Sequence, residues 1–168
     1  MTSFSMFSFE RQNASSDGGY QRMLVNNISS IVDGKLKHCI GDTILHTLAG
    51  DFGLPNLSAE TEGYDILRRL FDLGPDGFGP SVRECCLSMI DWQNEGYSVP
   101  GGISIEPFMH TPLGVAILYN NLACAELLLQ HGADPNIPGE WGQSPLFFAN
   151  RNRSEEAVEL LIAHGALL

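Results

Sequence analysis

A block of sequence near the C-terminal end of the chain occurs twice at a fixed spacing. Residues 111–113 (Thr-Pro-Leu) are matched by residues 144–146 (Ser-Pro-Leu), and residues 131–133 (His-Gly-Ala) by residues 164–166. Both pairs give one period, because 144 − 111 and 164 − 131 are both 33. A period of this length predicts one supersecondary unit per repeat, and such units bury their apolar faces by stacking on one another. The sequence therefore predicts a stack of similar layers.

The ends of helices can be placed within each unit. Thr111 and Ser144 stand directly before a proline, which suits the first helical position because an N–H there would have no helical partner. Their hydroxyl groups suit the N-cap position. Gly132 and Gly165 follow apolar helical runs, at the point where a left-handed residue commonly ends a helix. The pattern predicts short helices with defined starts and stops.

These starts and ends resemble the ankyrin repeat, whose unit begins T-P-L-H-x-A and closes with G-A-D-x-N. Residues 111–116 are similar to that start, and residues 125–136 resemble the second helix and its exit. Residues 144–149 and 157–166 resemble a second copy. The resemblance implies an all-α fold, an ankyrin-repeat solenoid of helix-turn-helix units with β-hairpin fingers. It also implies a short array of about three recognisable repeats with insertions.

The chain departs from the family pattern at two places in each unit. Gly114 and Phe147 stand where the family has histidine. Residues 120–121 (Asn-Asn) and 153–154 (Arg-Ser) replace the Gly-His that usually separates the two helices. We expect these departures to change local hydrogen bonds and to leave the fold intact.

A third start lies upstream at residues 41–49, and it keeps the family histidine as His46. Residues 66–76 resemble its second helix. The distance from start to glycine is about ten residues longer than in the unit that begins at residue 111, which indicates an insertion. Residues 52–62 are rich in turn-forming residues, so we place the inserted loop there.

The segment between the third start and the next repeat has two interpretations. Residues 81–94 have apolar residues at roughly helical spacing and predict a helix. Residues 96–111 resemble a stretched finger. The segment is then either a degenerate repeat that lost most of its first helix, or an extra helix inserted into a long finger.

The whole chain is divided accordingly. Residues 1–17 are expected to be flexible, and residues 18–40 to form an N-terminal amphipathic capping helix and first finger, because an apolar stripe runs from Tyr20 to Val32. The alternative for that helix is independent partner binding. Residues 41–168 form the predicted ankyrin repeat domain. Its parts are 41–76 (repeat with insertion), 77–108 (degenerate repeat or inserted helix), 109–141 (repeat) and 142–168 (repeat).

Charge and composition limit the partners. The net charge is −11 and only nine residues are basic, which disfavours nucleic acid and anionic membranes because both need clustered Lys and Arg. A protein partner with a basic or apolar surface is expected, bound by a monomeric chain. The four cysteines have no disulfide-scaffold spacing, and neither a signal peptide nor a bilayer-spanning run is evident. We therefore expect a cytoplasmic or nuclear location.

No motif for catalysis, cofactor or metal binding stands out. The chain has no C-x-x-C, no H-x-x-x-H pair, no G-x-S-x-G and no phosphate-binding glycine loop. His131 and His164 follow helices, where a partial positive charge would suit the helix dipole. The prediction is a protein that is not an enzyme and needs no cofactor or metal. The alternative is a catalytic site at Cys85 and Cys86, which would require that they share a buried polar pocket with a histidine.

Candidate binding positions follow from the resemblance, since ankyrin proteins bind through finger tips and the exposed part of the first helix on a concave surface. Trp141 lies in the last finger and is the main candidate anchor, because interface hot spots favour Trp, Tyr and Arg. Its alternative role is packing on the neighbouring finger, at Ile103, Ile105 and Phe108. Leu118 is the candidate expected to pack locally. The full set of candidates is Trp141, Tyr119, Arg151, Gln143, Leu118 and Asn152.

The functional expectation is a non-catalytic adaptor or inhibitor that holds another protein at its concave surface. A narrower alternative is an IκB-like or host-directed inhibitor, because the starts at residues 41–46 and 111–116 resemble those of IκB-like proteins. A third alternative is an enzyme or pathway-associated protein with a site in the segment 77–108. The apolar end at residues 166–168 adds the expectation that the last layer docks on something or frays.

Overall fold

The computed structural model describes residues 43–50, 62–94, 110–139 and 141–168. The predicted N-terminal cap, residues 52–61 of the inserted loop predicted at 52–62, and most of the long finger lie outside these residues, and Glu62 is helical. The described part is helical and contains no strand, so the all-α prediction is confirmed. Its helices are α4 (Ile44–Gly50), α5 (Glu62–Phe71), α6 (Pro80–Ser88), α7 (Pro112–Leu118), α8 (Leu122–Gln130), α9 (Pro145–Arg151) and α10 (Glu155–Ala163).

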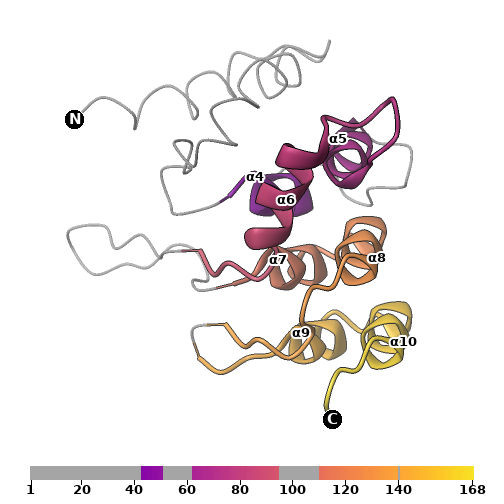
Figure 1. Ribbon diagram of the computed structural model, residues 1–168. Helices are drawn as coiled ribbons and strands as arrows, with labels where there is room; N and C mark the ends of the chain where they lie inside the picture. The colour runs from indigo at the N-terminus through magenta and orange to yellow at the C-terminus, as the bar shows by residue number, and fades with distance from the viewer. Residues whose placement is uncertain (1–42, 51–61, 95–109, 140) are drawn as a thin grey trace, which may run out of the picture.

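The helices form two rows that run along a stack (Figure 1). Helices α4, α7 and α9 make one row, in which α4 contacts α7 and α7 contacts α9. Helices α5, α8 and α10 make the second row, in which α8 contacts both of its neighbours. Each layer is therefore a short first helix paired with a second helix, as expected of a solenoid of helix-turn-helix units.

Helix α6 stands outside these two rows. It contacts α5, while α4 packs directly on α7, so no layer separates the third start from the next repeat. These contacts favour the inserted helix over the degenerate repeat. The prediction of a helix to Asn94 was wrong, because α6 ends at Ser88. Beyond it, Asn94 exchanges hydrogen bonds with the backbone of His110 at 2.8 and 3.0 Å, and this pairing holds the chain out of a helical path.

The predicted helix ends are confirmed by their hydrogen bonds. The Thr111 side chain accepts from the Gly114 N–H at 3.1 Å, and the Ser144 side chain occupies the matching place in α9. Gly132 and Gly165 have φ values of 94° and 93°, a conformation that glycine adopts without steric cost. The starts of the first helices α7 and α9 and the ends of the second helices α8 and α10 are thus fixed by local chemistry.

Two residues that are not glycine also adopt a left-handed backbone conformation, in the turn between the two helices of a layer. Asn120 and Arg153 both have φ of 56°, at the position where the family has glycine. Asn tolerates this region, whereas Arg does so at a cost. We expect Arg153→Gly to raise the free energy of unfolding by about 0.5–1 kcal/mol, and Asn120→Gly to raise it less. Urea unfolding with an unchanged m-value measures both; equal or opposite effects would contradict the strain argument.

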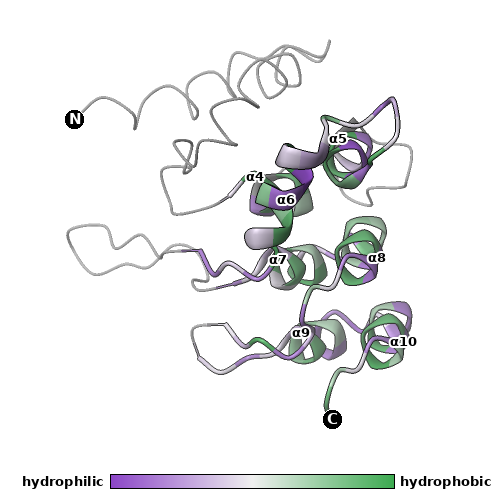
Figure 2. Cartoon of the chain, in the orientation of Figure 1, coloured by the Kyte–Doolittle hydropathy of each residue, from purple (hydrophilic) through white to green (hydrophobic). Residues whose placement is uncertain are grey.

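The core runs continuously through the layers. Apolar side chains from both rows are buried, including Leu45, Leu67, Leu113, Leu128 and Phe148. Figure 2 shows hydrophobic residues along α7, α8 and α9. Helices α7 and α8 have a layer on both sides, and α9 packs on α7. Because the buried face of each layer is covered by the next one, stability depends on contacts between layers as much as on contacts within them.

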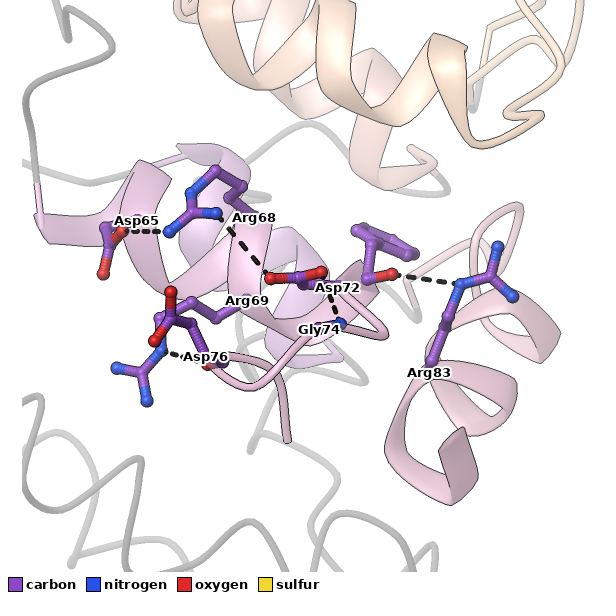
Figure 3. A network of polar contacts seen from close by, with 8 residues as sticks. Asp65, Arg68, Arg69, Asp72, Gly74, Asp76 and Arg83 are labelled. Atoms are coloured by element: carbon purple, nitrogen blue, oxygen red, sulfur yellow. Dashed lines mark hydrogen bonds and ion pairs between the residues drawn. The ribbon is translucent and has the colours of Figure 1, made fainter. Parts of the chain in front are cut away.

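Three arginines secure the turn after α5 (Figure 3). Arg68 pairs with Asp65 at 3.1 Å and with Asp72 at 3.8 Å. Arg69 donates to the Asp76 carbonyl at 2.8 Å and lies over the Phe78 ring, and Arg83 donates to a carbonyl at the end of α5. Since these cations already serve structural contacts, this region offers no cluster of unpaired positive charge for a phosphate backbone.

Candidate protein-binding surface

The last finger presents its tryptophan to solvent. The Gly139 N–H donates to the Gln143 carbonyl at 2.9 Å, and Gly142, with φ of 72°, donates back to Gly139 at 3.0 Å. This closes a tight turn without a strand, whereas β-hairpin fingers were expected. Trp141 sits in the turn with 69% of its surface exposed. A ring so exposed is available for contact with a partner; the residues of its alternative packing site lie outside the described part of the chain.

The first-helix candidates divide into exposed and structural residues. Tyr119 caps the end of α7 and is partly exposed, and Arg151 is exposed at the end of α9. Leu118 is half-buried against the core, as its local packing role requires. Gln143 is also half-buried. Tyr119 and Arg151 therefore keep the most surface for a partner.

Asn152 has a structural role that the sequence did not reveal. Its Nδ2 atom donates to the carbonyls of Ile117 at 2.9 Å and Leu118 at 3.1 Å. These bonds join the layer of α9 to the layer of α7. They also bring residues 118–119 next to residues 151–152. Since its amide is engaged within the chain, Asn152 is a weaker candidate for partner contact than its neighbours.

A buried histidine pair joins the first two described layers. His46 Nδ1 accepts from the Thr43 N–H at 3.0 Å, which leaves Nε2 to donate to the His110 carbonyl at 2.9 Å. The family histidine therefore bonds to backbone between layers, as the resemblance implies. The carbonyl that His46 contacts belongs to His110, the residue directly before Thr111, where the next repeat begins.

His110 itself fills the space that Gly114 leaves empty. Its ring lies against Gly114 and Gly139, where an added Cβ at Gly139 would overlap it, and meets the Phe148 ring edge-on at 5.1 Å. Sequence reasoning missed this residue. The available signal was a histidine four positions before a glycine that stands where the family has histidine.

The burial of His110 predicts a pH dependence of stability. Burial, together with the nearby His46, lowers the pKa of His110 below its ordinary value. A lowered pKa means that the folded state binds its proton less readily than the unfolded chain. The contribution of the neutral His110 ring to the free energy of unfolding is therefore complete above about pH 6.5 and is lost as the pH drops below that value. We expect urea midpoints to decrease between pH 7.5 and 5.5, and His110→Gln to reduce the decrease. An unchanged slope in that variant would assign the effect to other groups.

The expected charge preference was wrong for His131. Its ring stacks on Phe71 at 4.4 Å, and burial with the nearby Arg83 lowers its pKa. The neutral ring is favoured there, and packing decides its role rather than the helix dipole. His164 Nδ1 contacts the Leu160 carbonyl at 2.9 Å at the end of α10.

The cysteines examined as an alternative site have the environment of core residues. Cys86 is fully buried, and burial raises its thiol pKa to about 12. Burial also raises the pKa of Cys85. A thiolate is the reactive form, so both shifts oppose nucleophilic use. Within the described ranges, no group of three or more His, Cys, Asp or Glu side chains is placed to hold a metal ion.

Comparison with known proteins agrees with the geometry. A sequence model for ankyrin repeats (3 copies) matches residues 14–168, and the chain therefore belongs to the ankyrin repeat family. Ankyrin repeats mediate protein–protein interactions. None of the helices in the described segments is long and apolar enough to cross a membrane.

The relatives share only part of their length with this chain. The putative ankyrin repeat protein YahD of Escherichia coli is 43% identical over 61 residues, which are 33% of this chain and 30% of that protein. The serine/threonine-protein kinase VIK of Arabidopsis thaliana is 40% identical over 97 residues, 51% of this chain and 22% of the kinase. Mouse ankyrin repeat and SOCS box protein 11 is 40% identical over 62 residues, which are 37% of this chain and 19% of that protein. The matched part of this chain thus spans less than a third of the length of each of these three relatives.

Proposed function

We propose that this chain is a non-catalytic adaptor or inhibitor that binds a partner protein through its last finger and the exposed ends of its first helices. The exposure of Trp141 is the observation that carries the proposal. A solvent-exposed indole on a tight turn is a preordered apolar anchor, and binding it costs little conformational entropy. Tyr119 and Arg151, exposed at the C-terminal ends of α7 and α9, supply further aromatic and cationic contacts.

The chemistry of the partner follows from the charge of the chain. A net charge of −11 favours association with a basic or apolar protein surface and speeds the encounter with it. The same charge disfavours nucleic acid and anionic membranes. We further propose that the chain binds this partner as a monomer, in the cytoplasm or the nucleus. An inhibitor of the IκB-like kind would act by covering a basic surface of its target.

The mutation Trp141→Ala tests the anchor. We expect loss of a hot-spot tryptophan to weaken partner binding by about 2 kcal/mol or more, which is roughly 30-fold. The partner is first captured from the native cell with the wild-type chain and identified by mass spectrometry, and Kd is then measured with purified proteins. Tyr119→Ala is expected to have a smaller effect in the same direction.

Leu73→Ala is the matched control, because Leu73 is also a large apolar residue that is 65% exposed, and it lies in the turn after α5, at the other end of the stack from α9 (Figure 1). It removes an exposed apolar side chain away from the last finger, and we expect it to leave Kd within about twofold. Equal urea midpoints for the two variants exclude general destabilisation. If Trp141→Ala binds the partner as the wild type does, the partner surface lies elsewhere on the chain and the proposal fails.

A further inference from the structure

The outer face of the last described layer carries exposed apolar side chains. Phe147 on α9 is 46% exposed and Ile162 on α10 is 45% exposed. The residue equivalent to Ile162 in the preceding layer is Leu129, which is only 5% exposed. Among the described residues, no helix lies beyond α9 and α10 on this side of the stack, where the C-terminal residues run out (Figure 1). This face is distinct from the finger that carries Trp141.

A groove of about 330 Å³ opens between α9 and α10 on the layer. Val158 lies in it, and Ile162 follows one helical turn later, so an apolar stripe continues from the groove along α10. Carboxylates border the stripe. The lining includes Ala149, Asn150, Arg153, Glu155, Val158 and Glu159. We call this feature the α9–α10 groove.

Another ankyrin layer is a poor match for this face. Asn150 is the equivalent of Ile117, which is fully buried between layers, and Glu155 is the equivalent of Leu122, which packs against the core. A further layer stacked in the usual way would bury the amide and the carboxylate against apolar side chains, at a cost unless each found a partner. The face is therefore built for an occupant with polar as well as apolar groups.

A second copy of the chain is disfavoured by charge. Glu155 and Glu159 outnumber Arg153 in the lining, and two copies meeting at this face would bring the same carboxylates together. The net charge of −11 on each chain adds repulsion at longer range. An occupant with positive charge beside Glu155 and Glu159 is attracted both by these carboxylates and by the net negative charge of the chain.

We propose that the α9–α10 groove binds an amphipathic α-helix of a partner protein. Its apolar side chains contact Val158 and Ile162, and its Lys or Arg side chains lie beside Glu155 and Glu159. A helix laid into an apolar groove is a recurring recognition mode, and the flanking charges fix its register. The groove gives the chain a second binding surface, as an adaptor that joins two proteins requires.

A synthetic probe tests this directly. The probe is an 18-residue fluorescein-labelled helical peptide with a leucine stripe flanked by lysines, and its binding to the full chain is followed by fluorescence anisotropy. We expect Glu159→Lys to weaken binding by about tenfold. Ile162→Ser is expected to act in the same direction. Glu156→Lys is the matched control, since Glu156 is an exposed residue of α10 outside the groove lining, and it should change Kd by less than about twofold.

The other arms separate this site from the finger and from self-association. Trp141→Ala should bind the lysine peptide as the wild type does, so failure of the finger proposal leaves this test intact. A peptide with glutamates in place of the lysines should bind at least about tenfold more weakly. Equal binding of that peptide, or equal loss with Glu156→Lys, would overturn the proposal. A dimer seen by sedimentation velocity and abolished by Ile162→Ser would overturn it in favour of a second copy.

Discussion

Phe148→Ala is expected to lower the free energy of unfolding by about 3–5 kcal/mol, the range typical for removing a buried aromatic side chain. Phe148 is 1% exposed, and its ring meets the His110 ring edge-on at 5.1 Å. The loss therefore opens a cavity where α9 packs on α7. It also removes the wall against which His110 is held. Urea unfolding followed by circular dichroism measures the change.

The adjacent Phe147→Ala variant is the control for this prediction. The two rings contact each other at 5.4 Å, but Phe147 lies on the open outer face. We expect its loss to cost less than about 1 kcal/mol, because little of its surface is removed from water. Similar losses for the two variants would mean that α9 does not pack with the face that the structure assigns to it.

Asn121→Ala is expected to cost about 2–4 kcal/mol, the second largest effect. The side chain accepts from the Cys124 N–H at 3.3 Å as the N-cap of α8, and its Nδ2 donates to the Ala49 carbonyl at 3.1 Å in the layer before. Loss of the cap costs about 1 kcal/mol. A buried carbonyl left without this donor costs a further 1–3 kcal/mol or so.

Ser154→Ala separates these two contributions. Ser154 occupies the equivalent position one repeat later, where its Oγ caps α10 by accepting from the Ala157 N–H at 3.3 Å. We expect this variant to lose only the cap, about 1 kcal/mol. The difference between the two variants then measures the bond between layers. If Asn121→Ala costs no more than Ser154→Ala, that bond contributes nothing to stability.

The features that could be predicted from the sequence depend on neighbouring residues. Thr111 with its following proline, and Gly132 with its positive φ, act within one turn of a helix, so a short stretch of sequence is sufficient to place them. The 33-residue period adds the stack, because similar units have similar apolar faces to bury. The family and the helix pairs followed from these local signals and were confirmed.

The features that were missed depend on residues far apart in the chain. Nothing near His110 in the sequence shows that its carbonyl receives His46 across 64 positions, or that its ring replaces a side chain absent at Gly114. Asn152 resembles a surface residue until its amide is seen on the α7 carbonyls. Asn94, which was predicted on the same helix as residues 81–88, likewise pairs with backbone 16 positions away in the chain.

The sequence by itself determined the class of architecture, the starts and stops of the short helices and the net charge of −11 on which the proposed partner chemistry rests. Only the tertiary structure decided which residues remain on the surface. Trp141 is exposed, Asn152 is engaged in the chain, Val158 lines a groove with acidic edges, and Ile162 is exposed one helical turn beyond it. The reason is physical: helix caps are satisfied by neighbours in sequence, whereas exposure is set by which layer covers which face.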